Sequence, residues 1–315
     1  MFKVQKMQIG KFTKLKLINL KTHEYVTIIP QFGANINELV LNKNGRNFSI
    51  IDGDRSLTSL INNKWFKGAK LIPFPNRINN GKYFFDKKKY QLPINFLSQN
   101  HAIHGLLYNK NFELEKTVSK KVSIYADLKY FYEQEIPGYP FHLQIKIRFF
   151  LTNKGFKCKT VIKNLSNVMI PIGDGWHPYF KTSGKVENLW LKLPTNRKIE
   201  VNKRMIPTGK KTLCNKFSAL SKIEKHQFDT GFALSKKRGI MSTELQDKEK
   251  NYSIILWQET GKMKYNYLQV FIPPSRNSIA LEPMTCNTNA FNNKDGLITL
   301  KPNQIFKACY GVYIK

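Results

Sequence analysis

The sequence predicts an all-β protein built as a large antiparallel β-sandwich. Apolar and polar residues alternate with a period of two over much of the 315-residue chain, which is typical of strands with one buried face. Turn-forming pairs separate these runs at the spacing of hairpins. Segments with helical periodicity are few, so we do not expect alternating strand–helix–strand units.

The expected strands follow one another along the whole chain. The clearest covers residues 142–149, where every second position is apolar. Further strands are expected over residues 25–29, 122–128, 158–163, 189–193, 252–257, 267–272, 278–282 and 306–313. Turns are expected at Asn44-Gly45, Asn80-Gly81, Pro137-Gly138, Asn153-Lys154-Gly155, Thr208-Gly209 and Asp295-Gly296. Short helices are expected over residues 57–66 and around Phe217, Leu220 and Ile223.

Composition and organisation indicate a single globular unit. Hydrophobic residues make up 41% of the chain and aromatic residues 13%, and no linker or internal repeat divides it, so we expect one domain over residues 1–315. No apolar run approaches the roughly 18 residues of a membrane span, and the first residues lack the apolar segment of a signal peptide. We therefore expect a cytoplasmic protein with no membrane partner.

The four cysteines are expected to be reduced thiols. Cys158, Cys214, Cys286 and Cys309 lie far apart and form no Cys-x-x-Cys pair, which disfavours a zinc ribbon or a redox motif. Free thiols fit a cytoplasmic protein. A single disulfide among them is the alternative.

The formal net charge of +31 raises the possibility of a nucleic-acid partner. The lysines are scattered through nearly every segment, often as the polar half of an alternating strand, rather than gathered on one element. No known nucleic-acid-binding motif is visible. We therefore expect no specific nucleic-acid partner, although weak attraction of phosphorylated or acidic ligands fits the charge.

The most informative stretch is residues 172–180, Ile-Gly-Asp-Gly-Trp-His-Pro-Tyr-Phe. Two glycines give the backbone freedom ahead of His177, and Pro178 keeps His177 itself extended. Aromatic residues, Trp176 among them, supply flat apolar surface on either side. An imidazole in such a frame suits a sugar ring that is both stacked and protonated. A lone histidine is more often structural, so the other motifs decide its role.

Two earlier stretches supply candidate binding groups. Arg77 lies between prolines and a turn glycine, so its guanidinium can be aimed at hydroxyls or a carboxylate; the alternative is a surface arginine. His101 and His104 lie three residues apart in a strand-like context, and no Cys or carboxylate cluster completes a metal site. We expect His104 to hydrogen-bond near a substrate and His101 to be structural.

Two later stretches supply carboxylates. Asp229 lies among aromatic residues and needs a hydrogen-bond partner, which is either a pair of sugar hydroxyls or a turn amide. Glu282 ends an apolar strand and precedes Pro283. Burial there would raise its pKa toward neutrality, which makes Glu282 the best general-base candidate in the chain.

Taken in order, these motifs resemble the aldose 1-epimerase (galactose mutarotase) family. The matching segments are Asn76-Arg77-Ile78, His104-Gly105-Leu106, Gly138-Tyr139-Pro140-Phe141, the residues around His177, Phe228-Asp229-x-x-Phe232, Leu281-Glu282-Pro283 and Ala290-Phe291-Asn292. Order and spacing match from about residue 33 to the end of the chain. The resemblance implies a galactose-mutarotase-like antiparallel β-supersandwich, an open cleft for a monosaccharide, and neither a metal nor an organic cofactor.

The same resemblance implies roles for individual residues. Glu282 matches the family's general base and His177, as an imidazolium, its general acid. His104 matches the second active-site histidine, and Arg77 and Asp229 match the groups that hold sugar hydroxyls. Trp176 is expected to stack on the sugar ring.

One departure concerns the choice of sugar. The galactose-active branch usually has Asn before its catalytic histidine and no proline after it, whereas this chain has Trp176-His177-Pro178. The chain is more similar to a related branch of aldose epimerases, and galactose is not implied as the substrate.

The expected activity is interconversion of the α and β anomers of a free aldohexose by acid/base ring opening and re-closure. Two alternatives keep the fold: a hexose-6-phosphate 1-epimerase, and a non-catalytic carbohydrate-binding or sensing domain. A third alternative, a basic β-protein that binds nucleic acid, predicts strongly salt-dependent retention on heparin. We expect a monomer or a homodimer.

Overall fold

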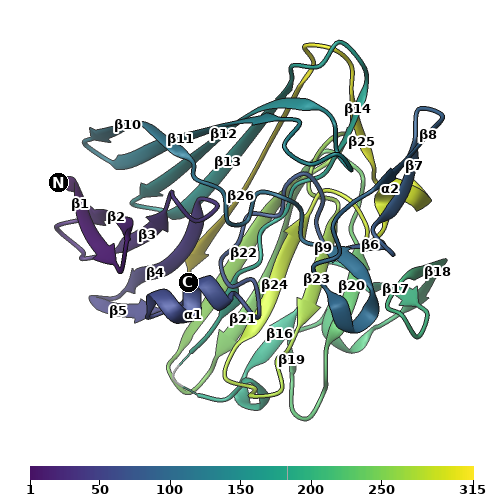
Figure 1. The fold of residues 1–315 in the computed structure, drawn as a ribbon. Helices are drawn as coiled ribbons and strands as arrows, with labels where there is room; N and C mark the ends of the chain where they lie inside the picture. The colour runs from purple at the N-terminus through teal and green to yellow at the C-terminus, as the bar shows by residue number, and fades with distance from the viewer. Residues whose placement is uncertain (183) are drawn as a thin grey trace.

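The computed structural model describes residues 1–182 and 184–315 and consists mainly of antiparallel strands (Figure 1). The N-terminal sheet has five strands in chain order. They are β1 (Phe2–Ile9), β2 (Phe12–Asn19), β3 (Tyr25–Ile29), β4 (Asn35–Lys43) and β5 (Arg46–Ser49). In the described part of the chain, no helix is both long and apolar enough to cross a membrane.

The largest sheet has nine strands and is formed from the middle and the end of the chain. In spatial order its strands are β10 (Glu113–Lys120), β11 (Ser123–Glu133), β12 (His142–Thr152), β13 (Gly155–Asn164), β26 (Ile305–Ile314), β22 (Tyr252–Thr260), β21 (Gly239–Asp247), β16 (Trp190–Lys192) and β19 (Ser221–Lys222). The C-terminal strand therefore lies between two hairpins that are distant from it in sequence.

A six-stranded sheet carries much of the site described below. Its strands, in spatial order, are β15 (Tyr179–Phe180), β24 (Ile279–Met284), β23 (Tyr267–Phe271), β20 (Asp229–Ala233), β17 (Arg197–Val201) and β18 (Pro207–Leu213). Three two-stranded sheets complete the fold: β6 (Arg77–Asn79) with β9 (His101–Ile103), β7 (Lys82–Phe85) with β8 (Lys88–Gln91), and β14 (Ile170–Ile172) with β25 (Ile298–Leu300).

The predicted all-β antiparallel architecture is confirmed, and each of the nine predicted strand segments coincides with an observed strand. Strand β12 shows the physical reason: Leu143, Ile145, Ile147, Phe149 and Leu151 are buried, and the residues between them are half-exposed. Each such side chain contributes roughly 2 kcal/mol by leaving water. The alternation visible in the sequence is therefore the alternation of buried and solvated faces.

Helical and turn predictions are less accurate. Helix α1 (Leu57–Asn62) begins where expected, after a Ser56 capping box, but ends early because Asn63 adopts a left-handed conformation with φ 41°. The predicted helix near Phe217 is wrong: a 3₁₀ turn (Lys216–Ser218) leads into β19. The predicted Thr208-Gly209 turn is also wrong, because both residues lie inside β18. The remaining helical elements are α2 (Ala290–Asn293) and 3₁₀ turns at Leu97–Gln99 and Val186–Asn188.

Three segments that are distant in sequence lie side by side between the sheets. Lys70 and Trp176 form an isolated antiparallel bridge, and Gly175 and Met284 form another. The segment before β15 therefore runs between the segment around Lys70 and strand β24. This arrangement brings His177 and Glu282 to the same place.

Candidate active site

A cleft of about 540 Å³ opens beside the six-stranded sheet. Its polar lining includes Arg77, His104, His177, Asp229, Gln269 and Glu282. A larger cavity of about 790 Å³ lies elsewhere, against β13 and β26. Its described lining residues include one carboxylate, Glu24, and no histidine. The chemistry-bearing side chains thus gather in the smaller cleft.

Backbone pairing on both sides fixes the segment that carries His177. The His177 amide donates to the Ala69 carbonyl at 3.0 Å, and the Gly68 amide donates to the His177 carbonyl at 2.9 Å. The imidazole stacks on Tyr179, with ring centroids 5.0 Å apart and planes 11° apart. The ring is 5% exposed and faces the cleft.

The two glycines ahead of His177 serve close packing rather than backbone freedom. Neither has a left-handed φ. A Cβ on Gly173 would lie 2.8 Å from the Cys286 sulfur, and one on Gly175 would lie 3.1 Å from Pro75 Cβ. The sequence interpretation of these glycines is therefore corrected: they allow neighbouring segments to approach.

The structure contradicts the expectation that Trp176 stacks on a sugar. Its side chain is fully buried and does not line the cleft. It stacks instead on Tyr310 of β26, with centroids 5.1 Å apart and planes 11° apart, and contacts Phe156 and Phe180. Successive side chains of an extended backbone point to opposite sides. Because His177 faces the cleft, Trp176 must face the core.

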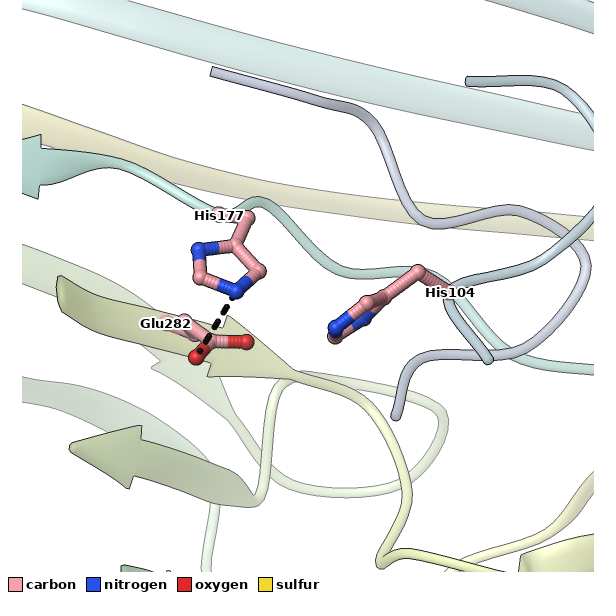
Figure 2. A group of neighbouring side chains, drawn as sticks. All are labelled: His104, His177 and Glu282. Carbon is pink, nitrogen blue, oxygen red and sulfur yellow. Dashed lines mark ion pairs between the residues drawn. The ribbon is translucent and has the colours of Figure 1, made fainter. Parts of the chain in front are cut away.

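His177 and Glu282 form the closest pair of titratable groups in the cleft (Figure 2). His177 Nε2 lies 3.4 Å from Glu282 Oε1. Glu282 comes from β24 and is 1% exposed. The two groups expected to act as acid and base therefore face each other.

Burial moves the pKa values of this pair in opposite directions. Desolvation lowers the pKa of His177 to about 3. Desolvation, reinforced by the charge of Asp229, raises the pKa of Glu282 well above its ordinary value, and Arg77 opposes this shift. Burial therefore disfavours the charged form of both groups.

His104 lies on the other side of His177. The two rings are 4.9 Å apart at 73°, and Phe66 contacts His104 at 4.7 Å. His104 has a left-handed φ of 61°, and a Cβ on the following Gly105 would lie 2.2 Å from the Ile72 carbonyl oxygen. Burial, together with the neighbouring His177 and Arg77, lowers the pKa of His104 well below its ordinary value.

Arg77 and Asp229 meet at the edge of the cleft. Arg77 Nη2 lies 3.6 Å from Asp229 Oδ2, and Arg77 Nη1 donates to Asn76 Oδ1 at 3.1 Å. The Asp229 side chain is 35% exposed, so it can accept hydrogen bonds from a ligand. Asn76 itself adopts a left-handed conformation, which lets its amide oxygen also accept from the Arg77 backbone amide.

Gln269 is a cleft residue that the sequence interpretation missed. It lies directly opposite Glu282 in the pairing of β23 with β24, so both side chains share one face of the sheet. Its amide donates to Asp229 Oδ1 at 2.7 Å. Strand register would have indicated this position, but a single glutamine in an alternating strand carries no such information.

Several buried polar atoms around the cleft lack a hydrogen-bond partner among the described residues. They include Arg77 Nε, His104 Nδ1, His177 Nδ1 and Glu282 Oε2. Buried polar groups in native proteins are nearly always paired, because an unpaired group costs about 1–3 kcal/mol. Their concentration here indicates a site whose partners arrive with a polar ligand.

Comparison with known proteins gives the family. A family model described as aldose 1-epimerase matches residues 16–311. The chain belongs to the aldose 1-epimerase family. The Escherichia coli protein YihR is 30% identical to this aldose 1-epimerase family member over 262 residues, which are 78% of this chain and 79% of YihR.

Solved structures share the fold of this family member. A galactose mutarotase-like protein from Clostridium acetobutylicum is 22% identical, with a TM-score of 0.88 over 100% of this chain and 98% of its own. Galactose 1-epimerase from Lactobacillus acidophilus is 15% identical, with a TM-score of 0.81 over 100% and 98% of the two chains. The predicted galactose-mutarotase-like fold is confirmed.

Three side chains of the cleft also have the composition of a metal site. Ligand atoms of His104, His177 and Glu282 lie within 4.8 Å of one another. Metal-bound histidines almost always donate their second ring nitrogen to an acceptor, which fixes the ring. Nδ1 of His104 and Nδ1 of His177 have no such partner among the described residues. The described protein groups therefore do not orient these two histidines in the way that is usual for metal ligands.

His101 has the structural role that the sequence predicts. Its Nδ1 accepts from the Asn80 amide at 3.2 Å, and its Nε2 lies 3.1 Å from the Arg204 carbonyl oxygen. With both ring nitrogens occupied by backbone, this buried imidazole holds β9 against two loops.

A second buried polar cluster lies behind the His177 segment, on the core side. Lys70 and Asp174 are both fully buried, and Lys70 Nζ lies 2.8 Å from Asp174 Oδ1. Lys70 also donates to Thr160 at 3.1 Å, and the Tyr265 hydroxyl donates to Asp174 Oδ2 at 2.6 Å. The aldose epimerase chain thus carries an ion pair across its core that the sequence analysis missed.

Proposed function

We propose that this protein interconverts the α and β anomers of a free aldohexose through the open-chain aldehyde. The observation that supports this most directly is the His177–Glu282 pair, 3.4 Å apart at the buried side of a polar cleft. Ring opening of a hemiacetal needs one group that removes a proton and one that supplies a proton. The pair offers a candidate for each role, close enough together to act on one sugar ring.

The reaction needs no change in the total number of protons. In ring opening, the Glu282 carboxylate takes the proton of the C1 hydroxyl, and the His177 imidazolium gives a proton to the ring oxygen. The bond between C1 and the ring oxygen breaks, its electron pair stays on that oxygen, and C1 becomes an aldehyde. Rotation about C1–C2 and closure on the opposite face of C1 reverse both transfers.

The resting pair can enter this cycle. A protonated Glu282 with a neutral His177 holds the same single proton as a carboxylate with an imidazolium. Moving that proton across the 3.4 Å gap converts the first form into the second. Hydroxyl groups of a bound sugar would stabilise the charged form because hydrogen bonds to a charged group favour that form.

Neighbouring groups are suited to holding the ring. The Asp229 carboxylate, oriented by Gln269 and Arg77, would accept hydrogen bonds from sugar hydroxyls. His104 would use its unpaired ring nitrogen for another hydroxyl. The described residues that line the cleft include two cationic side chains, Arg77 and Lys64. Arg77 is already paired with Asp229, which leaves Lys64 to attract a phosphate. This balance supports a neutral sugar over a phosphorylated one.

We place the reaction in the cytoplasm. All four cysteines are free, and three of them are buried. Unpaired cysteines fit a reducing compartment, which supports this location.

Polarimetry of freshly dissolved glucose and galactose tests the proposed function. Wild-type protein should accelerate mutarotation, and Glu282→Gln and His177→Asn should each lower kcat/KM by about 10²–10⁴-fold, the usual contribution of positioned proton transfer. His226→Asn and Glu249→Gln, the same changes at exposed positions, are the matched controls and should act as wild type. Equal rates in all five proteins would refute the assignment.

A further inference from the structure

The cleft extends beyond the groups that the proposed reaction uses. A series of aromatic rings leads outward from His177: Tyr179 at 5.0 Å, then Phe271 at 6.4 Å from Tyr179, then Trp65 at 5.8 Å from Phe271. Tyr179 is 1% exposed, whereas Phe271 and Trp65 are half-buried. The series therefore runs from the buried pair to the mouth of the cleft.

A polar group accompanies the aromatic rings at the mouth. Asn63 follows helix α1 in a left-handed conformation and lines the cleft with Trp65. Both polar atoms of its side chain are buried and have no hydrogen-bond partner among the described residues. An amide offers two donor hydrogens and an acceptor oxygen, which match the hydroxyl groups of a sugar.

The size of the cleft also exceeds what one ring needs. Its volume of about 540 Å³ lies within the range of roughly 300–1,000 Å³ found for sites of drug-sized ligands, which are larger than a single pyranose. Half-exposed aromatic rings supply large, rigid apolar contact area at a low cost in side-chain entropy. The C–H face of a second pyranose has the shape and polarity to cover Trp65 and Phe271.

We propose that Asn63, Trp65 and Phe271 form a second sugar-ring subsite, so that the preferred substrate is the reducing end of a di- or oligosaccharide. This inference rests on the proposed function, because it places the reducing ring against His177 and Glu282. The second ring stacks on Trp65 and Phe271, and one of its hydroxyls pairs with the Asn63 amide. Lys64, whose ammonium lies 5.5 Å from the Trp65 ring centre, remains in solvent.

Mutarotation kinetics on matched sugars test the subsite. Freshly dissolved glucose, cellobiose, maltose, lactose and glucose 6-phosphate are compared with the wild type, Trp65→Ala and Trp190→Ala. Trp190 is half-buried on β16, outside the lining of the cleft, and makes the matched control. At least one disaccharide should exceed glucose in kcat/KM by about tenfold, and Trp65→Ala should remove that ratio while Trp190→Ala keeps it.

Three kinetic results would overturn the subsite. They are a kcat/KM for glucose that equals or exceeds that for every disaccharide, a Trp65→Ala variant whose kcat/KM falls equally for all sugars, and a higher kcat/KM for glucose 6-phosphate than for the disaccharides. Calorimetric titration of the wild type and Trp65→Ala with the same disaccharides separates this inference from the proposed function. Absence of catalysis on every sugar refutes only the proposed function. Equal disaccharide Kd values for the two proteins refute the subsite.

Discussion

Two buried polar clusters lie on opposite sides of the same backbone segment. On the cleft side, His177 faces Glu282, and several neighbouring polar atoms have no partner among the described residues. On the core side, Asp174 holds Lys70 at 2.8 Å and accepts from the Tyr265 hydroxyl. Both clusters are buried. The core side also has atoms without a hydrogen-bond partner among the described residues, Asp174 Oδ1 and Trp176 Nε1, but Asp174 Oδ1 lies 2.8 Å from the Lys70 ammonium, so the charges there are paired.

This difference separates a functional role from a structural one better than burial does. A fully paired buried network stabilises one arrangement of the chain. A buried polar group without a partner costs free energy and therefore needs an explanation, such as a catalytic role or a bound water or ion. The comparison predicts opposite responses to substitution on the two sides of the segment.

The largest expected effect on stability is on the core side. Lys70→Met should lower the free energy of unfolding by about 3–5 kcal/mol, because the charge of Asp174 is then buried without its partner. Lys70→Met combined with Asp174→Leu should recover most of that loss. Urea denaturation measures both values. If the double variant is as unstable as Lys70→Met, the stability lost on replacing Lys70 does not come from its pairing with Asp174.

A smaller loss is expected at the paired histidine. His101→Ala removes the partners of the Asn80 amide and the Arg204 carbonyl and should cost about 2 kcal/mol with little change in kcat/KM. His104→Ala should show the converse, a loss of activity with a smaller loss of stability. The comparison between paired and unpaired groups fails if the two histidines respond alike.

Removing the buried carboxyl should stabilise the protein. The folded-state pKa of Glu282 is raised, so the folded chain holds a proton that the unfolded chain releases as pH rises above its ordinary pKa. That stability is present at low pH and is lost as pH rises toward the raised pKa. Glu282→Gln should therefore be more stable than the wild type above the ordinary carboxyl pKa, by a margin that grows as pH rises toward the raised pKa. Denaturation at several pH values measures this; a pH-independent difference would contradict it.

The smallest expected effect is on the pH dependence of the rate. Because burial lowers the pKa of His177 to about 3 and raises that of Glu282, we expect neither group to titrate at its ordinary pKa. Mutarotation rates should vary by only about twofold between about pH 5 and 8. A bell-shaped dependence of the rate on pH, centred near neutrality, would contradict this expectation, because it would show that His177 and Glu282 titrate in that range.

The sequence was sufficient to predict most of the fold and the composition of the cleft. Alternation identified the long strands because each has one buried face, as β12 shows. The motifs around Arg77, His104, His177, Asp229 and Glu282 indicated side chains that the structure brings to one cleft. Their catalytic and binding roles remain predictions.

The errors have physical causes. Trp176 was assigned to the cleft although its neighbour His177 already occupied that side of an extended backbone. Lys70 gave no indication of burial, because a lysine among 52 basic residues resembles any other solvated one. Gln269 depended on strand register, which joins β23 to β24 only in three dimensions.

One small backbone feature ties the two sides of the cleft together. The Asp174 amide donates to Thr285 Oγ1, and the Thr285 amide donates to the Asp174 carbonyl, both at 2.9 Å. Asp174 precedes His177 by three residues, and Thr285 follows Glu282 by three. The positions of His177 and Glu282 are thus tied to each other through the backbone, while Asn63 and Trp65 belong to a loop after α1. Under the proposed function, sequence changes in this loop would alter which sugars are accepted without moving His177 and Glu282.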